Sequence, residues 1–220
     1  NQYRFSSRNF LIRFQKVEVL KLPQSSGVYI FLNRQRPIYI GKAKNLKARV
    51  LSYFSLPLSP KTKKMVAETT DFRIIRVNSE LEALLLEAYL IRKNQPRYNS
   101  SLKDDKHPLY IKITKETYPR VLTARLMDEK DSLAFFGPFP SSSNVRSVLR
   151  LLRRIFPYSD HKIGKSACIQ SHIGLCNPCP NKIEKTGNPK TKADLFKKYN
   201  KNIQMIKGVL SQKIPSVRKE

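Results

Sequence analysis

The segment 79–94, "SELEALLLEAYLIRKN", constrains the fold most, because it predicts a helix with one carboxylate out of place. Ser79 is a good N-cap residue, and Glu82 stands three residues later, as in a capping box. Glu80 lies in the first turn, where the helix dipole favours negative charge. Glu87 has only apolar helical neighbours three and four residues away: Ala83, Leu84, Leu90 and Ile91. The rest of the fold must therefore supply a partner for Glu87, since an unpaired carboxylate on an apolar face is costly.

Charge is the unusual feature of the composition. The chain has 220 residues, with 43 Lys+Arg against 16 Asp+Glu and a formal net charge of +27. Such an excess of positive charge favours a polyanionic partner. Nucleic acid is the first candidate, and an anionic membrane or an acidic protein is a weaker alternative. No apolar run has the length of a membrane span, and the N-terminus lacks the apolar core of a signal peptide. We therefore expect a cytoplasmic protein without a membrane partner.

The first half of the chain predicts a small α+β domain. Two β-rich runs, "GVYIFL" (27–32) and "PIYIG" (37–41), form a hairpin pattern. A short helix from Asn45 to Phe54 follows, then a possible helix near 61–69, a strand "DFRIIRV" (71–77) and the Glu87 helix, which Pro96 ends. This order predicts a three-stranded, mainly antiparallel sheet flanked by helices.

The second half of the chain predicts an extension with a different composition. "PLYIKIT" and "RVLTARL" indicate another strand pair, and "FFGPFPSSSNVRSVLRLLRRIF" indicates a turn and a basic amphipathic helix. We expect five segments in all: a basic leader (1–19), the α+β domain (20–103), a β-hairpin and basic-helix extension (104–160), a small cysteine-rich segment (161–185) and a basic helical tail or linker (186–220).

Several polar side chains of the first domain suit phosphate chemistry. Lys42 precedes a helix N-terminus, which is a good place for a phosphate. Arg49 and Tyr53 share one helix face, and the forked donors of an arginine can neutralise charge on phosphate oxygens. A tyrosine between two cations has reason for its pKa to fall and could act as a general base. Glu87 could hold one divalent cation, Mg²⁺ or Mn²⁺, against the same phosphate.

Each of these residues also has a purely structural interpretation. Strand tyrosines such as Tyr29 and Tyr39 usually pack in a half-buried sheet face. Lys42 and Arg49 could be solvated charges in a lysine-rich protein, and Glu87 could form a salt bridge with another element. The joint order of these residues along the chain favours function.

That order resembles the GIY-YIG nuclease superfamily, here as "GVY" (27–29) and "YIG" (39–41). It is most similar to the N-terminal half of the UvrC family. The stretches that carry the resemblance are "GVYIF", "YIGKAKNLKARVLSYF", "SELEALLLEAYLI", "QPRYNSSLKDDK", "FFGPFP" and "CIQSHIGLCNPC".

The resemblance implies a set of active-site residues: Tyr29, Tyr39, Lys42, Arg49, Tyr53, Glu87 and Asn99. It implies hydrolysis of one DNA phosphodiester, with a single metal on Glu87 and a water activated by a tyrosine. Family position assigns the general base to Tyr29 and the positioning of water or phosphate to Tyr39. The family incises damaged double-stranded DNA 3′ to a lesion after the helicase partner UvrB has prepared the site. The usual docking hairpin for UvrB, a second nuclease domain and tandem helix-hairpin-helix motifs would follow residue 220.

The cysteines lie in one short segment, "HKIGKSACIQSHIGLCNPC". Their odd number and the expected cytosolic setting argue against disulfides, and such a cluster more often binds metal. The resemblance implies four cysteines associated with an iron–sulfur cluster, but His161 stands in place of the first. His161, Cys168, Cys176 and Cys179 would form a structural site for zinc or an iron–sulfur cluster, with His172 as a competing ligand. A segment without metal is the alternative.

Two hypotheses remain. The first is a metal-dependent DNA endonuclease domain. The second is a catalytically silent relic of the same fold that binds DNA or acts as a scaffold, in which Glu87 satisfies a buried arginine. The chemical type expected at each catalytic position is present, which favours the endonuclease.

Overall fold

The computed structural model describes residues 19–55, 57–99 and 109–211. The chain divides into two compact units, residues 1–106 and 107–220. The expected leader lies almost wholly outside the described residues. None of the described helices is long and apolar enough to cross a membrane.

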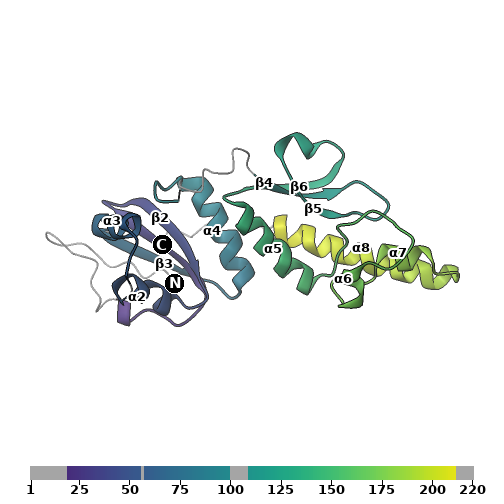
Figure 1. Cartoon of the computed structure of the whole chain (residues 1–220), viewed down its shortest axis with the longest axis horizontal. Coiled ribbons are helices and arrows are strands. Elements are labelled where there is room, and N and C mark those ends of the chain that lie inside the picture. The colour runs from purple at the N-terminus through teal and green to yellow at the C-terminus, as the bar shows by residue number, and fades with distance from the viewer. Residues whose placement is uncertain (1–18, 56, 100–108, 212–220) are drawn as a thin grey trace. The chain divides into compact units, whose positions relative to one another are not determined.

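The first unit is a three-stranded antiparallel sheet between helices (Figure 1). Its elements are β1 (Gly27–Asn33), β2 (Arg36–Ala43), α2 (Leu46–Ser55), α3 (Pro60–Glu68), β3 (Asp71–Arg76) and α4 (Glu80–Asn94). Strand β1 is central and buried along almost its whole length, in the order β2-β1-β3. The α+β prediction for this unit, with its hairpin, third strand and helices, is confirmed.

The two faces of this sheet carry different cores. Tyr29 and Phe31 of β1 point into a cluster with Val50 and Tyr53 of α2 and Met65 of α3. Helix α4 contacts β1 and β2 and buries Leu81, Ala83, Leu84, Leu86, Ala88 and Leu90. Because β2 is an edge strand, one side of its backbone is left for partners other than strands.

Helix α4 begins as its sequence predicts, with one difference. The Ser79 hydroxyl accepts a hydrogen bond of 3.1 Å from the Glu82 amide. The Glu82 carboxylate, however, accepts from the amide of Asn78, one residue before the N-cap, at 2.9 Å. Glu80 is an ion-pair partner of Lys44, with its Oε2 3.1 Å from Nζ.

The second unit is a second three-stranded antiparallel sheet with helices. Its elements are β4 (Leu109–Thr114), β5 (Val121–Ala124), η2 (Leu126–Glu129), β6 (Ser132–Phe139), α5 (Ser142–Ile155), α6 (Ile169–His172), α7 (Pro180–Glu184) and α8 (Pro189–Ser211). The expected strand pair is present, but β6 adds a third strand in the order β5-β4-β6. The prediction of a turn at "FFGPFP" was wrong: this stretch pairs with β4, and Phe135 stacks on Tyr110 with ring centroids 4.6 Å apart.

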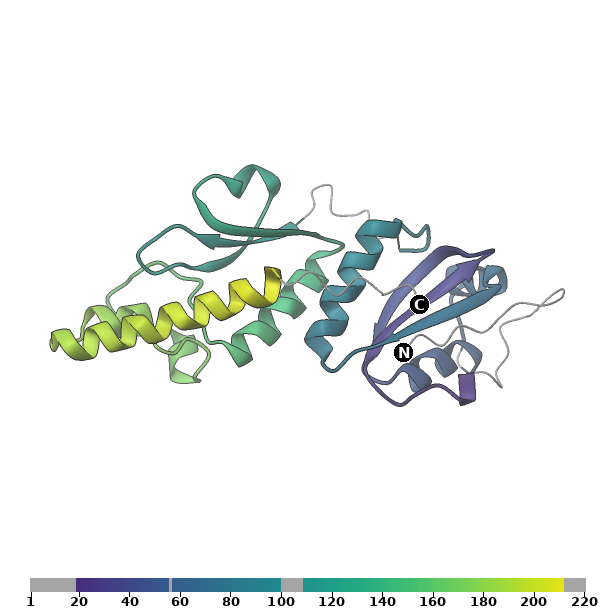
Figure 2. The same ribbon diagram turned by 180° about the vertical axis from the view of Figure 1, so that it is seen from behind.

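Helix α8 is built into the second unit. It buries Tyr199, Ile203 and Ile206, and the Tyr199 hydroxyl donates a hydrogen bond of 2.7 Å to the carbonyl of Pro119. The turned view shows α8, in yellow, along the side of the sheet that α5 also covers (Figure 2).

Candidate active site and metal centre

Glu87 finds its partner on the outer edge of β2. Its Oε1 accepts a hydrogen bond of 3.0 Å from the backbone amide of Lys42. This amide points away from β1 because β2 is the edge strand. The bond orients the carboxylate at the end of β2 and supplies no counter-charge.

Asn99 attaches to the same edge two residues earlier. Its Oδ1 accepts from the amide of Ile40 at 2.8 Å, and its Nδ2 donates to the carbonyl of Ile40 at 2.7 Å. The side chain is 8% exposed. Both polar atoms of Asn99 thus bond to the backbone of β2, as expected for a residue that positions the strand.

Tyr29, Arg49 and Tyr53 come together on the α2 side of the sheet. The hydroxyls of Tyr29 and Tyr53 lie 2.8 Å apart, and Arg49 Nε donates to the Tyr29 hydroxyl at 3.1 Å. The guanidinium of Arg49 also lies 5.3 Å from the centroid of the Tyr53 ring. Helix α2 presents both of its residues because they are one turn apart, and Asn45 caps its start by accepting from the Ala48 amide at 2.9 Å.

Tyr39 completes an aromatic cluster. Its ring centroid is 6.0 Å from that of Tyr29 and 6.1 Å from that of Phe31. Tyr29 pairs with Gly41 across the hairpin and Phe31 pairs with Tyr39, so the two tyrosines are diagonal neighbours. Tyr39 is half-buried, whereas Tyr29 is 1% exposed.

The prediction that a tyrosine pKa falls was wrong for the protein without bound DNA or metal. Burial raises the pKa of Tyr29 well above its usual range, and the neighbouring Tyr39 and Tyr53 raise it further. Arg49 lowers this pKa, but by less than burial raises it. Burial, with Tyr39 second, also raises the pKa of Tyr53 to about 12. The sequence indicated that Arg49 lies near a tyrosine, but it did not indicate how deeply the Tyr29 phenol is buried.

Lys42 is anchored through its main chain and remains partly exposed. Its amide holds Glu87, and its Nζ lies 4.0 Å from Oε1 of Glu80. Two of the predicted residues therefore contact successive residues of β2. The Tyr29 phenol lies against Gly41, and the Glu87 carboxylate bonds to the amide of Lys42. The sequence did not indicate Gly41 as part of this arrangement, although its place in "YIG" was a signal.

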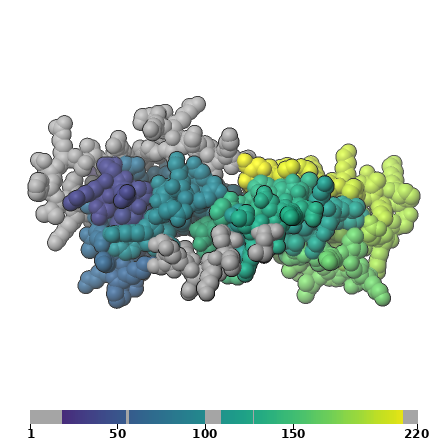
Figure 3. Space-filling view, turned by 90° about the horizontal axis from the view of Figure 1, so that it is seen from above, coloured from purple at the N-terminus to yellow at the C-terminus, as the bar shows by residue number. Residues whose placement is uncertain are grey.

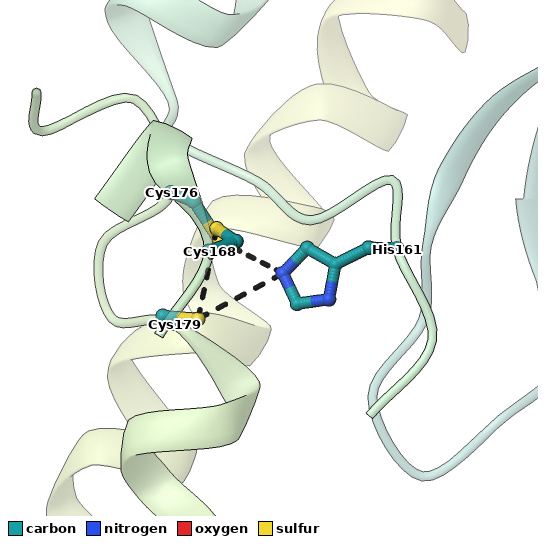
Figure 4. Close-up of side chains that lie close together, drawn as sticks. All are labelled: His161, Cys168, Cys176 and Cys179. Atoms are coloured by element: carbon teal, nitrogen blue, oxygen red, sulfur yellow. Dashed lines mark hydrogen bonds between the residues drawn. The ribbon is translucent and has the colours of Figure 1, made fainter. Parts of the chain in front are cut away.

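The second unit brings together the four predicted metal ligands (Figure 4). The ligand atoms of His161, Cys168, Cys176 and Cys179 all lie within 4.8 Å of one another. Cys179 Sγ is 3.8 Å from both Cys168 Sγ and His161 Nε2, and Cys176 Sγ is 4.0 Å from Nε2. His172 lies outside this group, exposed at the end of α6. The group could therefore hold one metal ion.

Short structural elements place these four side chains. Cys168 and Cys179 are the N-cap residues of α6 and α7, and Cys176 and Cys179 are fully buried. His161 Nδ1 lies 2.7 Å from the carbonyl oxygen of Lys162. A proton on Nδ1 would make this a hydrogen bond and leave the lone pair of Nε2 directed at the three sulfur atoms.

The fold and these residues define a GIY-YIG-type domain followed by a unit that carries a cluster of candidate metal ligands. Residues 25–100 match the model of the UvrC-like GIY-YIG domain, and residues 108–190 match that of the UvrC/Cho excinuclease middle domain. The chain therefore belongs to the UvrC family.

Individual relatives agree with this assignment. The UvrABC system protein C of Streptococcus uberis is 46% identical over 172 residues, which are 77% of this chain and 28% of the relative. The protein of the same name from Streptococcus pyogenes serotype M5 is 46% identical over 171 residues, with 76% and 28% coverage. The chain thus spans 28% of the length of these curated relatives.

Solved structures match over the first unit. The GIY-YIG N-terminal endonuclease domain of UvrC from Thermotoga maritima, bound to its catalytic divalent cation magnesium, is 43% identical, with a TM-score of 0.36. The match covers 38% of this chain and 92% of that domain.

Proposed function

We propose that this chain is a metal-dependent DNA endonuclease that hydrolyses one phosphodiester, 3′ to a lesion, in nucleotide excision repair. The observation that carries the proposal is the pair of groups on successive residues of β2: the Tyr29–Arg49–Tyr53 cluster at Gly41 and the Glu87 carboxylate at Lys42. The name and the catalytic cation of the Thermotoga maritima domain support it.

The first unit suits a single hard cation at Glu87. Mg²⁺ prefers oxygen ligands and retains several waters, so one oriented carboxylate is a sufficient protein anchor. Such a cation, Mg²⁺ or Mn²⁺, would supply positive charge to the scissile phosphate and lower the pKa of a bound water. Arg49, exposed on α2, would stabilise negative charge on the phosphate oxygens.

The remaining residues would orient the reacting groups. In its deprotonated form, Tyr29 would accept the proton of the attacking water, with Arg49 Nε and the Tyr53 hydroxyl placed to hold its oxygen. Tyr39 would position the water or the phosphate, and Lys42 would contact the phosphate. Asn99 would keep β2 in place through its two bonds to Ile40.

The geometry supports the silent-relic hypothesis less well than the endonuclease hypothesis. The endonuclease hypothesis explains why the Glu87 carboxylate is held at the Lys42 amide, one residue from the Gly41 against which Tyr29 packs, whereas a relic needs no such arrangement. A nicking assay on damaged and undamaged duplex, with and without Mg²⁺ or Mn²⁺, tests the proposal. Metal-dependent nicking is expected, and its absence under all conditions would favour the relic. A UvrB-type helicase partner and a cytoplasmic location remain predictions.

We propose further that the His161–Cys168–Cys176–Cys179 group holds one structural zinc ion. Zn–S bonds of about 2.3 Å in a tetrahedron place sulfur atoms about 3.8 Å apart, which is the distance between Cys168 Sγ and Cys179 Sγ. In a four-iron cluster each ligand binds a different iron, so the ligand atoms must spread around a larger body. Elemental analysis together with a visible absorption spectrum distinguishes zinc from an iron–sulfur cluster.

A further inference from the structure

Three arginines line one face of α5 at intervals of one helical turn: Arg146, Arg150 and Arg154. All three side chains are exposed, and the buried residues of α5 include Val145, Val148 and Leu152. Residues four apart on a helix share a face and are separated by about 6 Å along the axis. We call these three residues the arginine ladder.

The ladder has no carboxylate partner among the described residues. Helix α5 contains no acidic residue, and the ion pairs of the described part of the chain do not include any of the three arginines. Arg146 has one side-chain hydrogen bond, from Nη2 to Ser142 Oγ at 3.2 Å. The ladder is therefore presented to solvent rather than used to hold the unit together.

Arg153, on the same helix, differs from the ladder residues because it has partners within the unit. Its Nη2 lies 2.6 Å from Asp160 Oδ2, and its guanidinium lies 4.3 Å from the centroid of the Tyr158 ring. This arginine is half-buried and packs within the unit. The ladder residues make no such contacts, and like charges one turn apart destabilise a helix. The stability of the unit therefore does not explain three arginines at this spacing.

A second basic helix, α8, contacts the segment just after α5. Helix α8 covers the sheet face that α5 covers, and Asn202 Nδ2 donates to the carbonyl of Pro157, just after α5, at 2.9 Å. The outer side of α8 exposes Lys190, Lys197, Lys198 and Lys201, with Asp194 as the acidic residue among them. Figure 3 shows α8, in yellow, exposed along one side of the second unit.

We infer that the arginine ladder binds the phosphate backbone of duplex DNA, with the α8 lysines adding to the positive charge of the same unit. Arginine suits this role because its planar fork donates two parallel hydrogen bonds to one phosphate. A rigid helix with three such forks can engage successive phosphates without contacting bases, so it adds affinity and no sequence preference. The inference rests on the proposed function for its ligand, and it gives the second unit a share in holding the substrate.

The test compares two variants with equal loss of charge. The ladder variant carries Arg146→Gln, Arg150→Gln and Arg154→Gln. The control variant carries Lys115→Gln, Arg125→Gln and Lys130→Gln, three exposed cations in the loops that join the strands. Fluorescence anisotropy with a labelled undamaged duplex, over a series of salt concentrations without divalent cation, measures affinity and its salt dependence.

The ladder variant should bind at least about tenfold more weakly than the control. Its slope of log K against log salt should be shallower by about 2 to 3, because each lost phosphate contact contributes about 0.9. Its melting temperature should not fall, because the substitutions remove repulsion. Equal binding by the two variants would overturn the inference and leave the ladder to another partner, such as an acidic protein.

The nicking assay separates this inference from the proposed function. If the wild-type chain does not nick DNA but the ladder variant still loses affinity, the endonuclease proposal fails and the ladder stands. If the wild-type chain nicks DNA and the two variants bind equally, the ladder fails and the endonuclease proposal stands.

Discussion

The phenol of Tyr29 lies directly against Gly41 of the neighbouring strand. A Cβ atom at position 41 would lie 2.5 Å from Cζ of Tyr29, nearer than real Cβ contacts come. The same phenol oxygen accepts a hydrogen bond from Arg49 Nε and shares another with the Tyr53 hydroxyl. The absence of a side chain at Gly41 thus lets the phenol occupy the position at which α2 holds it.

Gly41→Ala should therefore remove activity by moving Tyr29. The added methyl group displaces the phenol from the position at which it bonds to Arg49, and neither β2 nor β1 can retreat without loss of strand pairing. We expect a large loss of nicking, with a modest fall in melting temperature and an unchanged circular dichroism spectrum. Near wild-type nicking by Gly41→Ala would show that the position of Tyr29 does not matter.

Glu87→Gln should abolish cleavage and leave DNA binding largely intact. The substitution keeps an oxygen that can accept from the Lys42 amide but removes the charge that binds a cation. Glu80→Gln is the matched control, because Glu80 is on the same helix and also lies near Lys42. Nicking rates with Mg²⁺ and Mn²⁺ are the measurement, and an active Glu87→Gln variant would refute the role of metal anchor.

Arg49→Ala should lower the cleavage rate by roughly two to three orders of magnitude, the scale for one preorganised charge-stabilising donor. Arg49→Lys should restore little, since lysine lacks the Nε that bonds to Tyr29. Lys47→Ala, on the same helix, controls for loss of charge. Single-turnover rates and DNA affinity should be measured together; an equal drop in both would mark Arg49 as an ordinary backbone contact.

Tyr29→Phe should abolish cleavage and change its pH dependence. Burial raises the pKa of Tyr29, so the deprotonated form is scarce at neutral pH and its fraction grows as pH rises. If Tyr29 is the base, the wild-type rate should increase with pH through the neutral and alkaline range. Tyr89→Phe, half-buried on α4, is the control. An active Tyr29→Phe enzyme, or a rate that falls with rising pH, would contradict the assignment.

Removal of the proposed zinc should unfold part of the second unit and spare the fold of the first. We expect about one zinc per chain, and a lower melting temperature after treatment with a zinc-specific chelator. His161→Ala should lose zinc, His161→Cys should keep it, and His172→Ala should have no effect, since His172 is outside the group. Wild-type protein with neither zinc nor iron would refute the metal site.

The sequence predicted local structure well because the signals were local. Ser79 and Glu82 mark the start of α4, and Asn45 caps α2. It failed at "FFGPFP", where glycine and proline suggested a turn. That stretch instead completes β6, because pairing with β4 and the stacking of Phe135 on Tyr110 are long-range contacts.

The sequence indicated which candidate residues come together, but it did not indicate the surroundings of their side chains. The order of motifs identified Glu87, yet only the three-dimensional structure shows that a main-chain amide is its partner. Likewise, the spacing of Arg49 and Tyr53 placed them on one face, whereas the pKa of Tyr29 depends on burial by the whole core. The grouping of His161 with the three cysteines was predictable because all four lie within one short segment.

The outer edge of β2 is closed by the side chains that the proposed chemistry uses. Glu87 and Asn99 occupy the amides of Lys42 and Ile40, which would otherwise be open to a strand from another molecule. The proposed metal anchor thereby also protects the sheet from self-association. Substitutions that shorten either side chain should promote aggregation as well as inactivity, so light scattering belongs beside every activity measurement on this edge.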